Sequence, residues 1–390
     1  MGIADEAALY ALGYWMHENH PTRIDGLCLN DIQKKTPCDE CSAACPAGLS
    51  IHVAVPDWHG CTDCGLCVTA CPAQAINASS AYGGRVEAVR ASARGCIVFS
   101  CDRYGGGADV VTACLASLPW DELAALAFEL PVVLKTSPCK TCPDESCVSR
   151  VKETIGKLRD FFGSEEFARR FFPRIPEYVK AERDRGEGSG AERRRTLAST
   201  ADTVKKGAAR LSRPDDAPRA ARSRTLLLEA HLRTPAEKRI DLHWRTLIED
   251  GACKGCGICV NMCPHGALSL AADGPEGRAV EGASGGGQDF DAESFRENAD
   301  AEDAFDASCA QGIPRYLVHD ASRCTQCGLC YMSCPQENLG GWDELVTKEL
   351  PALHFNSIDV AMCEKCGRLF KAESGKTRCP ACSRFRFAPR

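Results

Sequence analysis

The feature that most constrains this chain is a cysteine spacing that occurs three times. Residues 61–72 read CTDCGLCVTACP, with the spacing C-x2-C-x2-C-x3-C-P. The same spacing returns in CKGCGICVNMCP at 253–264 and in CTQCGLCYMSCP at 324–335. Three thiolates on so short a loop can hold one corner of an iron–sulfur cube, whereas the fourth, placed before a proline, points elsewhere. The repeats therefore predict sites for iron–sulfur clusters.

An incomplete fourth copy lies near the N-terminus. Cys38, Cys41 and Cys45, the last followed by proline, match the last three cysteines of the motif, but Lys35 stands where the first should be. We expect Cys28 to replace that first ligand. Such displaced ligands resemble those in the cluster-binding segments of glutamate synthase small subunits. The alternative is that Cys28 is a structural thiol beside a degenerate site.

Taken in pairs, these motifs resemble those of the bacterial-type dicluster ferredoxins, in which two 4Fe–4S cubes lie side by side. In that family the fourth cysteine of each motif serves the other cube. The resemblance implies four cubes with crossed ligand sets. Set one is Cys28, Cys38, Cys41 and Cys71, and set two is Cys45, Cys61, Cys64 and Cys67. Set three is Cys253, Cys256, Cys259 and Cys334, and set four is Cys263, Cys324, Cys327 and Cys330.

Between the two pairs of motifs, the sequence predicts a small α/β unit. Apolar runs at 97–100 and 132–134 are typical of buried strands, and residues 120–129, behind Pro119, are typical of a helix. Four cysteines follow these elements, namely Cys101, Cys114, Cys139 and Cys142. The layout loosely resembles the iron–sulfur subunits attached to some hydrogenases and heterodisulfide reductases, which implies an additional metal or iron–sulfur site. Free or redox-active thiols are the open alternative.

The C-terminal tail carries two further cysteine pairs. Cys363 and Cys366 are followed by Cys379 and Cys382, a spacing that can place four thiolates in a tetrahedron around zinc. The pattern resembles a zinc ribbon, and iron in a rubredoxin-like site is the alternative.

These features predict an α+β protein of several units. Apolar residues over 148–179 predict two helices that break at Gly163. We expect two ferredoxin-like dicluster units at 1–93 and 225–345, the Cys-rich α/β unit at 94–180, and a zinc-ribbon-like tail at 346–390. A charged linker at 181–224 and an acidic insertion at 273–306 complete the chain.

Composition narrows the cellular setting. The chain has 27 cysteines in 390 residues, and their grouping in C-x-x-C runs favours metal binding over disulfides. The first twenty residues show no export signal, and the most apolar run, at 123–134, is far shorter than the ~20 residues of a membrane span. We therefore expect a cytoplasmic protein without a membrane span. A net charge of −6 is too small to identify a partner.

The expected function follows from the chemistry of the cubes. A cube held by four thiolates has no open iron for a substrate, which favours one-electron transfer between a redox partner protein and a catalytic oxidoreductase subunit in anaerobic-type metabolism. No catalytic residues are expected, because the histidines at positions 52, 59, 231, 243 and 265 are isolated. Two alternatives stay open. One is thiol or two-electron chemistry at the α/β cysteines. The other is a redox-sensing nucleic-acid-binding regulator, disfavoured because the basic segment lacks interleaved aromatic residues.

Overall fold

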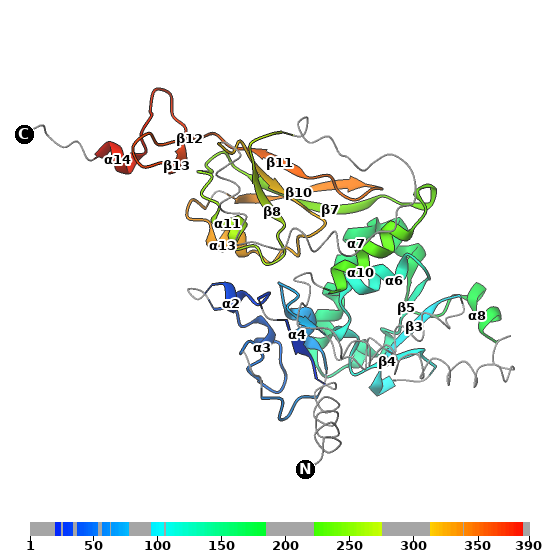
Figure 1. The fold of residues 1–390 in the computed structure, drawn as a ribbon. Coiled ribbons are helices and arrows are strands. Elements are labelled where there is room, and N and C mark those ends of the chain that lie inside the picture. The colour runs from blue at the N-terminus through cyan, green and yellow to red at the C-terminus, as the bar shows by residue number, and fades with distance from the viewer. Residues whose placement is uncertain are drawn as a thin grey trace, which may run out of the picture. The chain divides into compact units, whose positions relative to one another are not determined.

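The computed structural model divides into two compact units, Met1–Leu242 and His243–Arg390, and each is described by itself (Figure 1). Most of the predicted linker and of the predicted acidic insertion lies outside the described residues. The structure describes residues 20–24, 26–33, 37–53, 57–62, 64–77, 95–104, 107–184, 222–274, 313–337 and 339–384.

The N-terminal lobe, residues 20–77, is built from short elements around a small core. Strand β1 (Thr22–Arg23) pairs antiparallel with β2 (Ile76–Asn77), so the two ends of the lobe meet. Buried Ile51 and Val68 share one core cluster with Cys41 and Cys67. The cysteines therefore make up much of this small interior. The helices of the lobe are α2 (Leu29–Ile32), α3 (Glu40–Ala43) and α4 (Leu66–Ala70).

A parallel four-stranded sheet follows the lobe, in the order β4-β3-β5-β6. The strands predicted at 97–100 and 132–134 are confirmed as β3 and β5, and their continuous apolar runs suit a sheet covered on both faces. Carboxyl ends of parallel strands meet at one edge, so the loops that carry the α/β cysteines start from the same edge. The strands are β3 (Ile97–Cys101), β4 (Val110–Thr112), β5 (Val132–Leu134) and β6 (Phe171–Phe172).

Helices connect these parallel strands. The helix predicted at 120–129 is confirmed as α6 (Trp120–Ala127). Helix α7 (Glu145–Arg170) is interrupted where the sequence predicts a break, because Gly163 has φ 71° and ψ 160°. Only glycine adopts such a left-handed φ without steric cost. Shorter elements are η1 (Asp102–Tyr104), η2 (Leu115–Ser117), η3 (Ser137–Thr141) and α8 (Glu177–Asp184).

Helix α10 (Arg222–Arg233) packs on α6 within the first unit (Figure 1). The boundaries predicted from the sequence, 181–224 and 225–345, divide this helix between the charged linker and the second ferredoxin-like unit. Its contact is anchored by a buried ion pair, in which Arg224 Nε lies 3.0 Å from Asp121 Oδ2. Asp121 is 0% exposed, and the Arg224 guanidinium also stacks over Trp120 at 5.1 Å from the ring centre. The short η4 (Ala236–Lys238) follows α10.

The second unit contains an antiparallel sheet in the order β11-β9-β8 and a separate pair of strands, β10 and β7. Its core combines Leu247, Leu268, Leu317, Leu339 and Ile358. Cysteines of both predicted cubes pack against this core. The strands are β7 (Leu242–Glu249), β8 (Leu268–Ala271), β9 (Tyr316–His319), β10 (Leu339–Thr347) and β11 (His354–Ser357), and the helices are α11 (Ile258–Asn261) and α13 (Leu329–Ser333).

The tail forms a small hairpin followed by one helical turn. Strand β12 (Val360–Met362) pairs antiparallel with β13 (Leu369–Lys371), and α14 (Pro380–Arg384) lies beyond them. Phe370 is buried with Cys363 and Cys379, so the cysteines form part of the core of the hairpin. Across the described ranges, no helix combines the length and apolar character that crossing a membrane requires.

Candidate iron–sulfur and metal centres

Each of the four crossed cysteine sets lines one cavity of its own. The four cavities are similar in size. Cys28 lines the same cavity as Cys38, Cys41 and Cys71, which is the place that a displaced first ligand requires. The other cavities are lined by Cys45, Cys61, Cys64 and Cys67, by Cys253, Cys256, Cys259 and Cys334, and by Cys263, Cys324, Cys327 and Cys330. Their roles as cluster ligands remain predictions.

The three complete motifs share one backbone feature, a glycine in the left-handed conformation before the motif helix. Gly65, Gly257 and Gly328 have φ of 70°, 72° and 77° and stand directly before α4, α11 and α13. The left-handed turn reverses the chain between the second and third cysteines of each motif, which brings both to one cavity. At Gly65 a side chain is also excluded by space, because a Cβ there would lie 2.2 Å from Ser117 Cβ.

Backbone amides point at cysteine sulfurs around these cavities. Ala75 N donates to Cys71 Sγ at 3.2 Å, and Ala267 N donates to Cys263 Sγ at the same distance. Each donor stands four residues after the fourth cysteine of its motif. Such N–H groups stabilise negative charge on sulfur, and they are among the features that set the reduction potential of a cluster.

Burial and mutual repulsion disfavour free thiolates in these cavities. Burial, together with the charges of neighbouring cysteines, raises the pKa of the Cys67, Cys259 and Cys330 thiols to about 12 in each case. The neighbours of Cys259 in this respect are Cys253, Cys256 and Cys334, which are the rest of its predicted set. A cationic iron core held by these cysteines would offset both effects, because thiols lose their protons when they bind metal.

The α/β cysteines gather at the carboxyl edge of the parallel sheet. Cys101 ends β3, Cys114 caps η2 and accepts the Ala116 N–H at 3.4 Å, and Cys139 and Cys142 lie in and after η3. Burial raises the pKa of Cys139, and the charges of Cys101, Cys114 and Cys142 add to that rise. The structure therefore brings together the four cysteines that the sequence singled out.

A fifth cysteine, Cys147, joins this group, and the sequence predicts no partner for it. It lies in the first turn of α7, and its N–H donates to the capping carboxylate of Asp144 at 3.1 Å. A hydrogen bond from Cys147 lowers the pKa of the Cys114 thiol to about 7, while the pKa of Cys147 itself is raised. The only sequence signal for this pairing is the C-x4-C spacing that places Cys147 after Cys142.

The N-terminal lobe contacts the loop that carries Cys114. Thr69 Oγ1 of α4 donates to the Ala116 carbonyl of η2 at 2.7 Å, and Gly65 packs against Ser117. Helix α4 also carries buried Cys67 of set two. A short chain of contacts thus connects the cavity of set two with the α/β cysteines.

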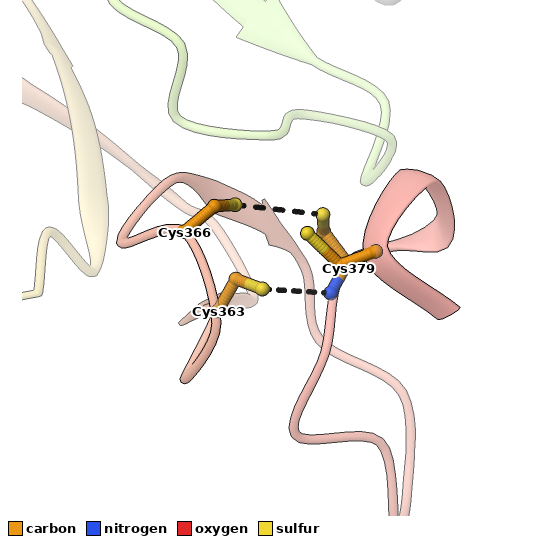
Figure 2. Close-up of side chains that lie close together, drawn as sticks. Cys363, Cys366 and Cys379 are labelled. Carbon is orange, nitrogen blue, oxygen red and sulfur yellow. Dashed lines mark hydrogen bonds between the residues drawn. The ribbon is translucent and has the colours of Figure 1, made fainter. Parts of the chain in front are cut away.

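The tail cysteines are the most tightly gathered group. The ligand atoms of Cys363, Cys366, Cys379 and Cys382 all lie within 4.8 Å of one another. Cys366 Sγ lies 3.8 Å from Cys379 Sγ, and Figure 2 shows Cys363 and Cys366 facing Cys379. Zinc–sulfur bonds of about 2.3 Å in a tetrahedron imply sulfur separations of about 3.8 Å. The residues present therefore fit one tetrahedral metal ion.

Cysteines outside these groups have different surroundings. Cys96 is 0% exposed and packs with Val98, Val133 and Val179, in an apolar cluster apart from the cavities. The lone Cys309 lies outside the described residues.

Cysteines that line paired cavities in this way are similar to the cluster sites of ferredoxin-type iron–sulfur proteins. Two family models agree with that class: a 4Fe-4S dicluster domain matches residues 252–338, and a 4Fe-4S binding domain matches residues 54–77. The resemblance to dicluster ferredoxins is thereby confirmed. Both matches lie outside the α/β cysteines and the tail. No curated protein and no solved structure matches the chain.

Proposed function

We propose that this protein is an electron-transfer protein that carries four 4Fe–4S clusters and relays single electrons between a redox partner protein and a catalytic oxidoreductase subunit in anaerobic-type metabolism. The observation that carries the proposal is the set of four cavities, each lined by the four cysteines of one crossed set. When bound, a cube supplies reversible one-electron chemistry. Four thiolates per cube leave no iron position for a substrate, so the chain itself has no need of catalytic residues.

The surroundings of the cysteines suit electron transfer within each pair of cubes. Cys41 of set one and Cys67 of set two pack in one core cluster with Ile51 and Val68. In the second unit, Cys259 of set three and Cys263 of set four pack against one shared core. Shared walls hold two clusters close together, while apolar side chains keep water from the sulfurs. Protein residues thus bind, position and shield the redox groups.

The α/β cysteines are proposed as an additional iron–sulfur or metal site. The hydrogen bond between Thr69 and Ala116 connects the helix that carries Cys67 of set two with the loop that carries Cys114. This contact supports a role of the α/β cysteines in the same electron relay. Among the described residues, only the tail group has three or more ligand atoms gathered closely enough for a single ion. A group of several metal atoms, whose ligands stand further apart, therefore suits the α/β cysteines better than one ion does.

Thiol chemistry at Cys114 is the second candidate, because the pKa of this thiol is lowered to about 7 by Cys147. A thiol with that pKa is about half thiolate near neutral pH, and the thiolate is the nucleophile. The cytoplasm, where thiols stay reduced, suits both candidates. No cysteine in the described ranges forms a disulfide.

Alkylation of the native, reduced protein separates these candidates. We expect uniform protection of Cys101, Cys114, Cys139 and Cys142, as bound ligands, measured by peptide mapping after brief treatment with iodoacetamide. Selective labelling of Cys114, with a rate that rises through about pH 7, contradicts the metal site and supports thiol chemistry. In that case Cys147→Ala serves as the matched variant, because loss of its hydrogen bond moves the labelling of Cys114 to higher pH.

Metal analysis tests the proposed function directly. After anaerobic purification we expect about sixteen iron and about sixteen sulfide per chain from four cubes, more if the α/β site is also loaded, and about one zinc from the tail. Cys379→Ser should remove the zinc and leave iron and sulfide unchanged. Fewer than four cubes in the paramagnetic resonance spectra of the reduced protein overturns the ligand assignment. Iron in place of zinc in the tail indicates a rubredoxin-like site instead.

A further inference from the structure

Within the part of the chain that the structure describes, Nε2 of His319 is a buried nitrogen without a hydrogen-bond partner. His319 ends β9 and is 1% exposed. Its Nδ1 accepts the backbone N–H of Leu247 at 3.2 Å, so the proton of a neutral ring sits on Nε2. Burial lowers the pKa of the ring to about 4, which keeps it neutral near pH 7. Nε2 is buried, and no hydrogen-bond partner for it lies among the described residues.

This ring forms part of the wall of the cavity of set four. His319 lines that cavity together with Cys263, Cys324, Cys327 and Cys330. Trp342, at 5.8 Å between ring centres and an angle of 63°, packs against the histidine and lines the same space. Because Nδ1 is held by Leu247, the Nε2 edge is the one left for the cavity. A buried donor without a partner is costly, so an acceptor in this cavity would remove that cost.

The neighbouring cavity of set three has an apolar side chain on the same strand. Leu317 stands two residues before His319 on β9, so the two side chains share one face of the sheet. Leu317 lines the cavity of Cys253, Cys256, Cys259 and Cys334. The cavity of set four is therefore lined by a buried ring with an N–H donor, and the cavity of set three is lined by an apolar side chain of the same strand. Lys254 lines the cavity of set three, but it is exposed, and water and salt screen its charge.

We propose that Nε2–H of His319 donates a hydrogen bond to a sulfur of the iron–sulfur cluster held by Cys263, Cys324, Cys327 and Cys330, and that it thereby makes this cluster easier to reduce. The inference rests on the proposed function, because it requires a cluster in this cavity. Reduction adds one electron and one negative charge to the cluster. A donor stabilises the more negative state, and the buried surroundings strengthen the interaction.

Two conservative substitutions test the role of the donor. In His319→Asn the side-chain oxygen can still accept the Leu247 N–H, but no donor reaches the cavity. In His319→Gln the amide nitrogen can reach the place of Nε2, while the contact with Leu247 is lost. His319→Leu replaces the ring with an apolar side chain, like that of Leu317 at the cavity of set three. The measurement is a potentiometric titration of the full chain, followed by paramagnetic resonance, with iron and sulfide content determined for every variant.

We expect His319→Asn and His319→Leu to move one reduction step to lower potential and to leave the other steps in place. The expected shift is about tenfold in the ratio of reduced to oxidised cluster, which is about 59 mV for one electron. His319→Gln should retain the wild-type potential. A shift in His319→Gln but not in His319→Asn shows a structural role through Leu247 and overturns the inference. Unchanged potentials in all three variants, with full iron and sulfide, overturn it as well.

Failure of the proposed function gives a different result. If Cys327→Ala removes no iron and no resonance signal, the cavity of set four holds no cluster, and the inference falls together with the proposed function. If Cys327→Ala removes about four irons but the histidine variants leave all potentials unchanged, only the inference is wrong.

Discussion

Replacing Cys71 by alanine should remove one cluster selectively, and it should be the one bound by Cys28, Cys38 and Cys41. Cys71 stands ten residues after Cys61 in the sequence, but it lines the cavity of set one. The expected result is the loss of about four of about sixteen irons and of one set of resonance signals. Iron analysis and paramagnetic resonance of the anaerobically purified variant provide the measurement.

The matched control for this experiment is Cys96→Ala. Cys96 is buried at 0% exposure among apolar side chains and lines none of the four cavities, so its loss should leave the iron content unchanged. Loss of the cluster at Cys61, Cys64 and Cys67 in Cys71→Ala, with the set-one cluster retained, would show that ligation in the first unit is not crossed.

Asp121→Ala should destabilise the first unit by about 3–5 kcal/mol, because it leaves the buried guanidinium of Arg224 without its partner. The Asp121 carboxylate is 0% exposed and also accepts a hydrogen bond from Gln74 Nε2 at 3.1 Å. Three separate stretches of chain therefore lose contacts at once. We expect the midpoint of thermal unfolding of the first unit to fall by roughly 6–20 °C, measured by calorimetry at one fixed scan rate.

An exposed ion pair between the same two regions provides the control. Arg233 Nη2 lies 3.4 Å from Glu129 Oε1, with the side chains 54% and 33% exposed. Because water and salt screen such a pair, Arg233→Ala should cost less than about 1 kcal/mol. Equal effects of Arg233→Ala and Asp121→Ala would mean that the buried pair contributes no more than a surface contact.

The local parts of the structure were predictable from the sequence. The spacing of the cysteines confines ligands to one short loop, and the glycine before each motif helix fits the turn that the loop needs. The strands β3 and β5 were predictable because short continuous apolar runs between turn residues are typical of buried strands. In these cases residues near in sequence determine the geometry.

The remaining features depend on contacts between distant residues. Cys147 lies beside Cys114 because α7 begins at the sheet edge where η2 ends. No local sequence pattern predicts this contact. His319 belongs to a strand pattern in which a histidine is unremarkable until its burial beside the cysteines is known. Helix α10 follows a charged segment, and its short apolar pattern gives no sign of which unit it joins.

The packing of α10 on α6 also concerns the order in which the protein is made. The first unit is built from two stretches of chain separated by residues 185–221, so it stays incomplete when α6 has already left the ribosome. At roughly 5–20 residues per second, α10 follows α6 after on the order of 5–20 s. During that interval Asp121 lacks Arg224, although every cysteine of sets one and two has been synthesised. Cluster insertion in the first unit can therefore begin before the unit closes.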